Sequence, residues 1–324
     1  MPLHKKTFSE LTPDELYDLL RVRSQVFVVE QDCVYQDLDM DDKKAIHVWL
    51  TEDDRILALA RICPAGTHMD NISIGRVIST ERGKGYGKQI MVYAIETAAE
   101  DLHADIIDIE AQEYAKGFYE KVAFSQSSGR FILDGIPHVR MTWTHPDVMM
   151  TERILLRRWH ENDAPSLFRY ASDPDVGTRA GWQAHQSIEE SREIIRSVFA
   201  NDTTWAVILR ETNEPVGCMG YFTHATSNIP IGENDCEVGY WIGKPHWNKG
   251  ICTEALRLMI DYCNNVKHFD NIWSDYFTGN PASGRVMEKC GFHDTGRLNR
   301  CSHLLGGDKE MVRVMRWTAS DKNK

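Results

Sequence analysis

The sequence carries the same short motifs twice, in the same order and at nearly the same spacing. A Gly-rich segment begins at Arg82 as RGKGYG and again at Trp247 as WNKGIC. A second motif follows in each half, FYEKVAF from Phe118 and VMEKCGF from Val286, and a short apolar segment ends at Trp143 and at Trp317. Ordered similarity at one interval indicates one fold used twice. We therefore expect two domains, residues 1–147 and 148–324, joined within THPDVMM (144–150).

Composition narrows the class of protein. The 324 residues suit about two domains, and 42% of them are hydrophobic, as in a chain with a folded core. The net charge of −11 argues against a nucleic-acid partner, because phosphate binding needs a basic face. No apolar run approaches the roughly 18 residues of a membrane span. The first residues also lack the apolar stretch of a secretory signal, so we expect a cytoplasmic protein with no membrane partner.

The eight cysteines are scattered and include no CxxC pair. This spacing argues against a zinc ribbon and against a disulfide framework. We expect no bound metal.

Strand and helix patterns alternate in both halves. ISIGRVIS (72–79) is typical of a strand that runs into the Gly-rich turn, residues 88–102 have helical spacing, and residues 105–111 are typical of a buried strand. The second half repeats this order with a strand at 236–242, a helix at 253–265 and a strand at 271–277. The pattern predicts a layered α/β (α+β) fold in each half.

The first Gly-rich turn has the chemistry of an anion site. Glycine permits positive φ and brings no Cβ, so consecutive backbone N–H groups can converge on a phosphate at the start of a helix. Arg82, Lys84 and Lys88 add full positive charges. The segment is neither a GxxxxGK[ST] loop nor a GxGxxG fingerprint. We interpret it as a pyrophosphate site, with an ordinary Gly-rich turn as the alternative.

An acidic run, QDCVYQDLDMDD (31–42), holds much of the negative charge of the first half. One interpretation is a solvated loop, and the other is an acidic lip that attracts a cationic amine. A calcium loop is excluded, because Asp42 stands where glycine is required and Val48 where the final glutamate is required.

These motifs resemble those of the GNAT N-acetyltransferase superfamily. In the first half RxxGxG resembles the acyl-CoA loop, and FYEKVAF resembles the closing helix, with Ala123 in the usual glycine place. Residues 22–35, His47, 75–80, 111–114 and 134–138 make this half similar to the ElaA-like branch, although Leu133 stands at an expected acidic position.

The second half resembles the RimJ/RimL-type branch of that superfamily. The likeness lies in residues 151–159, 237–255 and 280–292. Trp247 occupies the Arg or Gln place, Asn248 the first glycine place and Cys252 a small-residue place. Asparagine tolerates the left-handed region, so we expect the turn to persist.

The resemblance implies a fold and an activity. Each domain would be a twisted, mixed sheet of six to seven strands, flanked by helices, with a splayed central strand pair. The activity would be acetyl transfer to a primary amine by direct attack in a ternary complex, with acetyl-CoA as co-substrate. The acceptor would be a small-molecule amine or a protein N-terminal amine, and the chain a monomer or a homodimer.

The resemblance also implies which residues bind the co-substrate. In the first half they are Val77, Ile78, Arg82, Gly83, Lys84, Gly85, Tyr86, Gly87 and Lys88. In the second half they are Trp241, Ile242, Trp247, Asn248, Lys249, Gly250, Ile251, Cys252, Thr253 and Asn280, the last of which would bind the pantetheine amide.

Three residues are catalytic candidates. Glu237 would be the base of the second half, acting through water, although strand alternation turns it away from Ile242 unless a bulge intervenes. Ser283 would be the acid of the second half, and Tyr119 would protonate the thiolate in the first. The alternatives are an Arg-paired strand carboxylate for Glu237, a helix cap for Ser283 and a core aromatic for Tyr119.

The base of the first half stays open among Glu110, His47 and His138, and we interpret Cys33 as a packing residue. Two functional hypotheses therefore remain. Either both halves are enzymes, with an aminoglycoside among the conceivable acceptors, or one half only binds acyl-CoA as a sensor or stabilising module. The N-terminal half is the stronger candidate for that second role.

Overall fold

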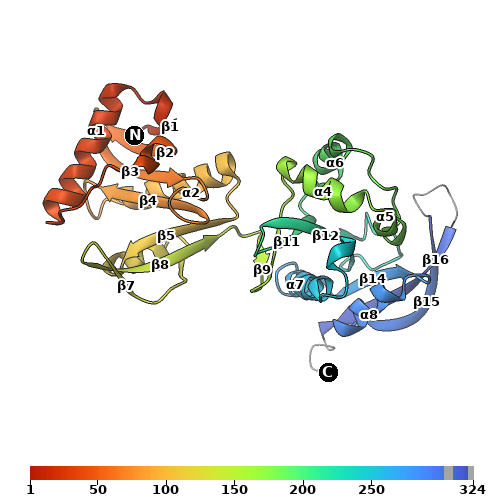
Figure 1. Ribbon diagram of the computed structural model, residues 1–324. Helices are drawn as coiled ribbons and strands as arrows, with labels where there is room; N and C mark the ends of the chain where they lie inside the picture. The colour runs from red at the N-terminus through yellow and green to blue at the C-terminus, as the bar shows by residue number, and fades with distance from the viewer. Residues whose placement is uncertain (303–308, 320–324) are drawn as a thin grey trace. The chain divides into compact units, whose positions relative to one another are not determined.

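The computed structural model describes residues 1–302 and 309–319 (Figure 1). The chain divides into two compact units, Met1–Pro146 and Asp147–Lys324. Over the described residues, none of the helices combines the length and apolarity that a bilayer span requires. Each unit has its own sheet and its own hydrophobic core.

The first unit is built on an eight-stranded sheet in the order β1-β2-β3-β4-β5-β8-β6, with β7 also paired to β8. The strands are β1 (Leu3–Thr7), β2 (Ile46–Glu52), β3 (Arg55–Cys63), β4 (Ile72–Ser79), β5 (Ile106–Gln112), β6 (Ser125–Gln126), β7 (Phe131–Leu133) and β8 (Ile136–Thr144). Only β4 and β5 run parallel among these paired neighbours.

The helices of the first unit are α1 (Pro13–Arg23), α2 (Tyr86–Leu102) and α3 (Lys116–Glu120). A capping box between Thr12 and Glu15, with proline at the first position, starts α1. A π-helical turn, Ser24–Glu30, continues it. Shorter turns lie at Phe8–Glu10, Met40–Lys43 and Glu113–Ala115. The buried face of α2, with Ile90, Met91, Ala94 and Ala98, packs into the first core.

The second unit also has an eight-stranded sheet, in the order β15-β16-β14-β13-β12-β11-β10-β9. Its strands are β9 (Met149–Met150), β10 (Ile154–Arg157), β11 (Thr204–Leu209), β12 (Glu214–Thr223), β13 (Cys236–Ile242), β14 (Asn271–Phe277), β15 (His293–Ser302) and β16 (Lys309–Thr318). Here β13 and β14 are the parallel neighbours.

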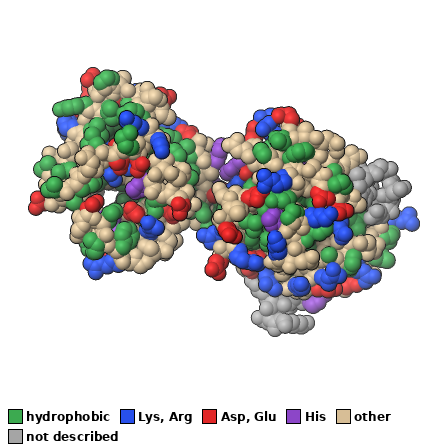
Figure 2. Space-filling model, viewed as in Figure 1, with side chains coloured by type: hydrophobic (Ala, Val, Ile, Leu, Met, Phe, Trp, Pro, Cys, Tyr) green, Lys and Arg blue, Asp and Glu red, His purple; other side chains and the backbone are tan. Residues whose placement is uncertain are grey.

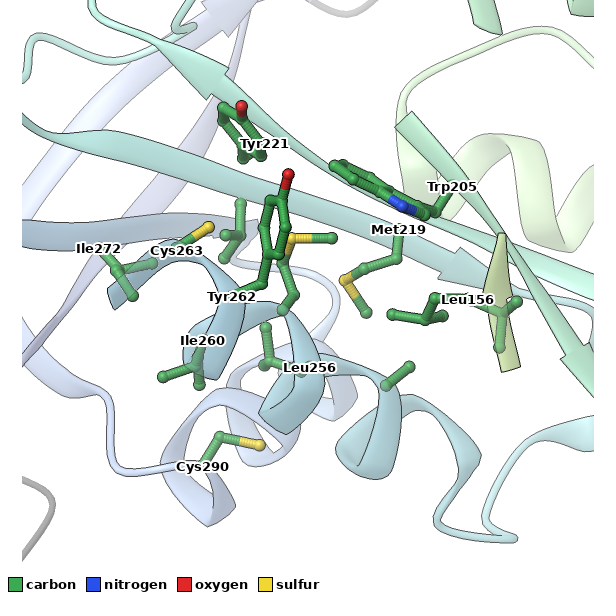
Figure 3. Packing of buried hydrophobic residues seen from close by; sticks show 14 of the residues in the cluster. Leu156, Trp205, Met219, Tyr221, Leu256, Ile260, Tyr262, Cys263, Ile272 and Cys290 are labelled. Atoms are coloured by element: carbon green, nitrogen blue, oxygen red, sulfur yellow. The ribbon is translucent and has the colours of Figure 1, made fainter. Parts of the chain in front are cut away.

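The helices of the second unit are α4 (Ala164–Ala171), α5 (Pro174–Ala180), α6 (Ile188–Ile194), α7 (Ile251–Asn265) and α8 (Pro281–Lys289). A π-helical turn, Ile195–Phe199, extends α6, and shorter turns lie at Glu161–Asp163 and Lys244–His246. Figure 3 shows the core between α7 and the sheet, where Tyr262 lies beside Trp205. Their ring centroids are 5.3 Å apart. This packing fixes α7, and with it the turn that precedes α7, against β11 and β12.

Both sheets open at their parallel strand pair. β4 pairs with β5 only at Ile72↔Ile107 and Ser73↔Asp108. β13 pairs with β14 only at Cys236↔Ile272 and Glu237↔Trp273. The remaining residues of each pair diverge, which confirms the predicted splayed strands. Each sheet has eight strands instead of the six to seven that the resemblance implies, because β6, β7 and β9 add short segments of two or three residues.

The two copies differ in the strand that precedes the Gly-rich turn. In β4, Arg76 and Val77 together lie opposite the single residue Ala60, and Arg76 has a φ of 53°. This is a β-bulge. In β13 the register with β12 is continuous from Cys236 to Ile242. The bulge that could have turned Glu237 toward the face of Ile242 is therefore absent.

Candidate active sites

The two Gly-rich turns have matching backbone conformations. Gly83 and Gly85 have φ values of 80° and 84°, and Asn248 and Gly250 have 60° and 80°. Asn248 thus occupies the left-handed region like the glycine at the equivalent place. Gly85 and Gly250 are the N-caps of α2 and α7, and neither helix start has a side-chain cap. First-turn amides in this situation are available to an anion, aided by the helix dipole.

The predicted co-substrate residues of the first unit surround the start of α2. Arg82 is the most open, with a side chain 81% exposed and 3.5 Å from Glu30. Lys84 and Lys88 are also exposed. Val77 and Tyr86 pack at the edge of the first core, whereas Ile78 is buried against α1 on the other face of the sheet. Gly87 lies next to the ring of Phe118 on α3, where an added Cβ would make an ordinary contact at 3.5 Å.

Tyr119 lies on α3 in an aromatic cluster. Its ring centroid is 4.9 Å from that of Phe118 and 6.1 Å from that of Phe124, and it packs against the first core. Burial raises the pKa of the Tyr119 phenol, which keeps it protonated at neutral pH. The residue thus has the core contacts of the structural alternative and the protonation state that a proton donor needs.

A cavity of about 460 Å³ occupies the open end of the second sheet. It brings together most of the predicted residues of that unit: Trp241, Ile242, Trp247, Asn248, Gly250, Ile251, Cys252, Thr253, Asn280 and Ser283. Lys249 and Glu237 are not part of its lining. Trp247 helps to hold the turn, because its indole N–H donates to the carbonyl of Ile242 at 2.6 Å.

The cavity lining also includes charged residues that sequence reasoning missed. Arg179 comes from α5, and Arg285 and Lys289 come from α8. Arg285 and Lys289 are four residues apart, so their shared helix face was a signal in the sequence. Figure 2 shows Lys and Arg side chains distributed over this side of the C-terminal unit. These cations give the cavity a positive rim suited to an anionic ligand.

Asn280 and Ser283 lie at the start of α8. The Asn280 side chain makes no capping hydrogen bond, and it donates to the carbonyl of Arg179 at 3.5 Å. Ser283 Oγ lies 3.0 Å from the hydroxyl of Tyr240, which also donates to the Ser283 carbonyl at 3.1 Å. Burial raises the pKa of Tyr240. Tyr240 shares the face of Ile242 by strand alternation, a signal that the sequence offered.

Glu237 is a buried carboxylate with neutral partners. It is 3% exposed, and it accepts hydrogen bonds from Ser227 Oγ and from the backbone N–H of Asn228, both at 2.7 Å. These bonds attach the loop after β12 to β13. The expected arginine partner is not what binds it, and without a bulge its side chain stays on the face opposite Ile242.

Asp275 on β14 is a candidate that sequence reasoning missed. Its Oδ2 atom is buried and has no hydrogen-bond partner. Burial, together with the nearby charge of Glu237, raises the pKa of Asp275 to about 7. Perturbed carboxyl groups of this kind cluster at functional sites.

The acidic run of the first unit forms a buried ion-pair network. Asp37 and Asp42 are 3% and 5% exposed. Arg23 binds both of them, at 2.9 and 2.7 Å, while Arg61 binds Asp42 at 2.9 Å. The further pairs are Arg61–Asp39, Arg76–Asp37 and Arg76–Asp39. For these aspartates, both the solvated loop and the acidic lip were wrong, because arginines from distant elements neutralise them.

Two of the base candidates of the first unit, His47 and His138, contact backbone carbonyls. His47 is buried, with Nε2 at 3.0 Å from the carbonyl of Asp42, and burial lowers its pKa. His138 has Nδ1 at 2.9 Å from the carbonyl of Ile136 and stacks on Phe131. Cys33 Sγ lies 3.6 Å from the carbonyl of Asp134, an interaction with the loop between β7 and β8.

Glu110, the remaining candidate, lies between the side chains of His68 and Arg140. Its carboxylate is 3.6 Å from His68 and 3.3 Å from Arg140. His68 was missed by sequence reasoning, and it also contacts Asp41 at 3.2 Å. The pairing lowers the pKa of Glu110 and raises that of His68. The pair thus connects β5 to the loop after β3.

Comparison with known proteins bears on both units. Two family models, each described as an acetyltransferase (GNAT) domain, match residues 9–145 and 153–293. The UPF0039 protein C11D3.02c of Schizosaccharomyces pombe is 38% identical over 140 residues, which cover 42% of this chain and 92% of that protein. The chain belongs to the GNAT acetyltransferase family. It is an acyltransferase with two GNAT domains in tandem, the first of them ElaA-like.

Two further relatives match at similar coverage. Protein ElaA of Escherichia coli is 37% identical over 137 residues, covering 41% of this chain and 90% of ElaA. The crystal structure of Escherichia coli ElaA is similar to this chain at 34% identity and a TM-score of 0.42. The match covers 44% of this chain and 98% of the ElaA chain in that structure. The uncharacterized N-acetyltransferase YoaA of Bacillus subtilis is 27% identical over 164 residues, covering 49% of this chain and 90% of YoaA.

Proposed function

We propose that the C-terminal GNAT domain transfers an acetyl group from acetyl-CoA to a primary amine by direct attack within a ternary complex. The observation that carries this proposal is the single cavity that joins the uncapped start of α7 to the Tyr240–Ser283 pair. An anion-binding end and a proton-donating end in one space are what thioester aminolysis needs.

The residues present suit the co-substrate. The amides of the turn before α7, together with Arg285 and Lys289, would hold the phosphates. Asn280, whose side chain is not used as a cap, would bind the pantetheine amide. A backbone N–H near Ile242 would donate to the thioester carbonyl, where negative charge develops. When bound, the coenzyme supplies the activated acetyl group.

The departing thiolate must gain a proton. The Ser283 hydroxyl would donate it, and the hydrogen bond to Tyr240 would let the buried phenol replace the proton of Ser283. The same chemistry in the N-terminal domain would fall to Tyr119, with the turn around Arg82 and Lys84 as its phosphate site.

The second candidate function concerns the N-terminal domain alone. There Arg76, at the bulge of β4, is held by Asp37 and Asp39, and two of the base candidates are bonded to backbone carbonyls. This favours a domain that binds acyl-CoA as a sensor or a stabilising module without turning it over. The acceptor class, a small-molecule or protein N-terminal amine, belongs in this scheme to the C-terminal domain.

Calorimetric titration of the full chain with acetyl-CoA tests both proposals. We expect two coenzymes per chain, and one per chain in each of the charge-reversed variants R82E/K84E and R285E/K289E. R55E, an exposed reversal outside both sites, should bind like the wild type. Absence of binding by the wild type would overturn the proposal.

Thiol release separates catalysis from binding. Spermidine, a serine-initiated peptide and kanamycin would serve as amine probes. We expect release to survive R82E/K84E and to be lost in R285E/K289E. The reverse result would assign the chemistry to the N-terminal domain instead.

A further inference from the structure

We propose that Asp275 is the base that takes the proton from the acceptor amine in the C-terminal domain. This inference rests on the proposed acetyl transfer, and it replaces Glu237 in that role. It is carried by the position of Asp275 at the separation of two strands, by its unpartnered oxygen, and by the walls of the sheet face that it shares.

The strand register places Asp275 at the opening of the sheet. Glu237↔Trp273 is the last paired position of β13 and β14, and Asp275 lies two residues further along β14. Side chains two apart on a strand share a face. Asp275 therefore lies on the face of Trp273 and Glu237, beside the part of β13 from which β14 has separated.

The cavity reaches that same face. Its lining includes Tyr240 and Ile242 from one face of β13 and Trp241 from the other, so it touches both faces of that strand. Asp275 itself is not among the lining residues. Trp241 shares the face of Glu237 and Asp275 by alternation. A thioester entering from the α7 side would thus present its carbonyl to an amine held on the Asp275 side.

Aromatic side chains cover the outer part of this face. The ring centroids of Trp182 and Trp241 are 5.7 Å apart. A Cβ on Gly181 would lie 3.3 Å from the ring of Phe277. The end of α5 therefore contacts β14 at Phe277, two residues beyond Asp275. Aromatic walls around a carboxylate suit a cationic amine, which they attract by cation–π contact.

The immediate charge environment leaves Asp275 reactive. Its buried Oδ2 has no partner, whereas the Glu237 oxygens are already taken by Ser227 and Asn228. The residue opposite it on β16 is the apolar Val314. The ionisable groups near it on β13 are Glu237 and Tyr240.

The arginines of this region lie at the cavity or over the Trp273 ring. Arg179 lies at the cavity on α5, and Arg316 and Arg297 lie over the Trp273 ring. Of these groups, the neighbour that acts on the Asp275 carboxyl is another acid, Glu237. A carboxylate in this setting has a raised affinity for a proton, as a base for an ammonium group requires.

The acceptor ammonium gives one proton to the Asp275 carboxylate, and the neutral nitrogen attacks the thioester carbonyl. A C–N bond forms and the C–S bond breaks, with the electron pair leaving on sulfur. Ser283 gives a proton to the thiolate, and the second nitrogen proton leaves the nitrogen for water, from which one proton restores the Tyr240–Ser283 pair. Asp275 returns its proton to water, so one ammonium and one acetyl-CoA give one amide, one CoA thiol and one released proton.

The test compares D275N with D202N in the full chain. Asp202 is exposed, which makes D202N a matched loss of one carboxylate outside the site. With ethylamine as acceptor, we expect D275N to lower kcat about 100-fold at pH 7, with the acetyl-CoA dissociation constant unchanged. D202N should match the wild type in both. An unchanged kcat in D275N would overturn the proposal.

A second acceptor separates proton removal from general damage. Trifluoroethylamine is largely neutral at pH 7, so it does not need a base before attack. We expect D275N to lower its kcat far less than that of ethylamine. Equal losses with the two amines would show a structural role and overturn the proposal.

A direct titration keeps the inference testable if neither amine is turned over. Carbon-detected NMR of the Asp275 carboxyl, assigned by its absence in D275N, should show a midpoint near neutral pH. A midpoint in the ordinary aspartate range would overturn the proposal. Failure of the wild type to bind acetyl-CoA is the separate result that would overturn the proposed function.

Discussion

The hydroxyl of Tyr240 lies 3.0 Å from Oγ of Ser283, which links β13 to α8 at the cavity. The pair connects a buried phenol to a hydroxyl at the start of a helix. This hydrogen-bond distance would let a proton pass directly from one side chain to the other.

Removing either hydroxyl should slow thiol release. We expect Y240F and S283A each to lower kcat about 100-fold, and the double variant to be no slower than the worse single variant, because residues that act as one relay are not additive. Y262F, a change in a buried core tyrosine of the same domain, is the control. Additive losses in the double variant would contradict a shared path.

The turn before α7 should respond to Asn248 according to its backbone conformation. Asn248 has a φ of 60°, where a Cβ without a local hydrogen-bonding side chain costs about 1–2 kcal/mol. We expect N248A to lower the C-terminal unfolding transition in calorimetry and to weaken acetyl-CoA binding. N248G should preserve both, and a loss in N248G equal to that in N248A would show that the asparagine side chain itself matters.

The buried ion pairs of the N-terminal domain should be essential to its stability. Arg23 is 2% exposed and binds both Asp37 and Asp42. We expect R23M to cost about 3–5 kcal/mol in urea unfolding, because it leaves buried carboxylates undercompensated. R21M removes the exposed pair with Asp18 and should cost less than about 1 kcal/mol. Similar costs would contradict the network.

Asp275 should make the C-terminal domain less stable as pH rises. Its folded pKa, about 7, lies above its ordinary value, so the folded protein holds this proton more tightly than the unfolded chain does. The loss in the free energy of unfolding that comes from ionised Asp275 is absent at low pH. It grows as the pH rises from the ordinary aspartate pKa to about 7, and then levels off. We expect D275N to raise the C-terminal Tm at pH 8 but not at pH 4. A gain of equal size at both values would exclude this titration.

Local sequence predicted the features that local chemistry sets. Gly83, Gly85 and Gly250 adopt the left-handed turns expected of glycine, and Asn248 joins them because asparagine tolerates that region. The splayed strand pairs came from a resemblance to a known family. Residues 280–283 come together because they follow one another in the chain.

Contacts between residues that are far apart in the sequence could not be predicted in this way. The acidic run was misinterpreted because its partners, Arg23, Arg61 and Arg76, come from α1, β3 and β4. Asp275 was missed because its surroundings depend on where β13, β14 and the loop after β12 meet. Neither neighbourhood has a local pattern in the sequence, so charge counting and periodicity do not reveal it.

The two-residue contact between β13 and β14 has a mechanical consequence. Beyond Glu237 and Trp273 the backbone ladder does not continue, and a side-chain hydrogen bond from Ser274 Oγ to the carbonyl of Val238 joins the two strands there. An elongated molecule rich in amides could complete both edges and stiffen the domain.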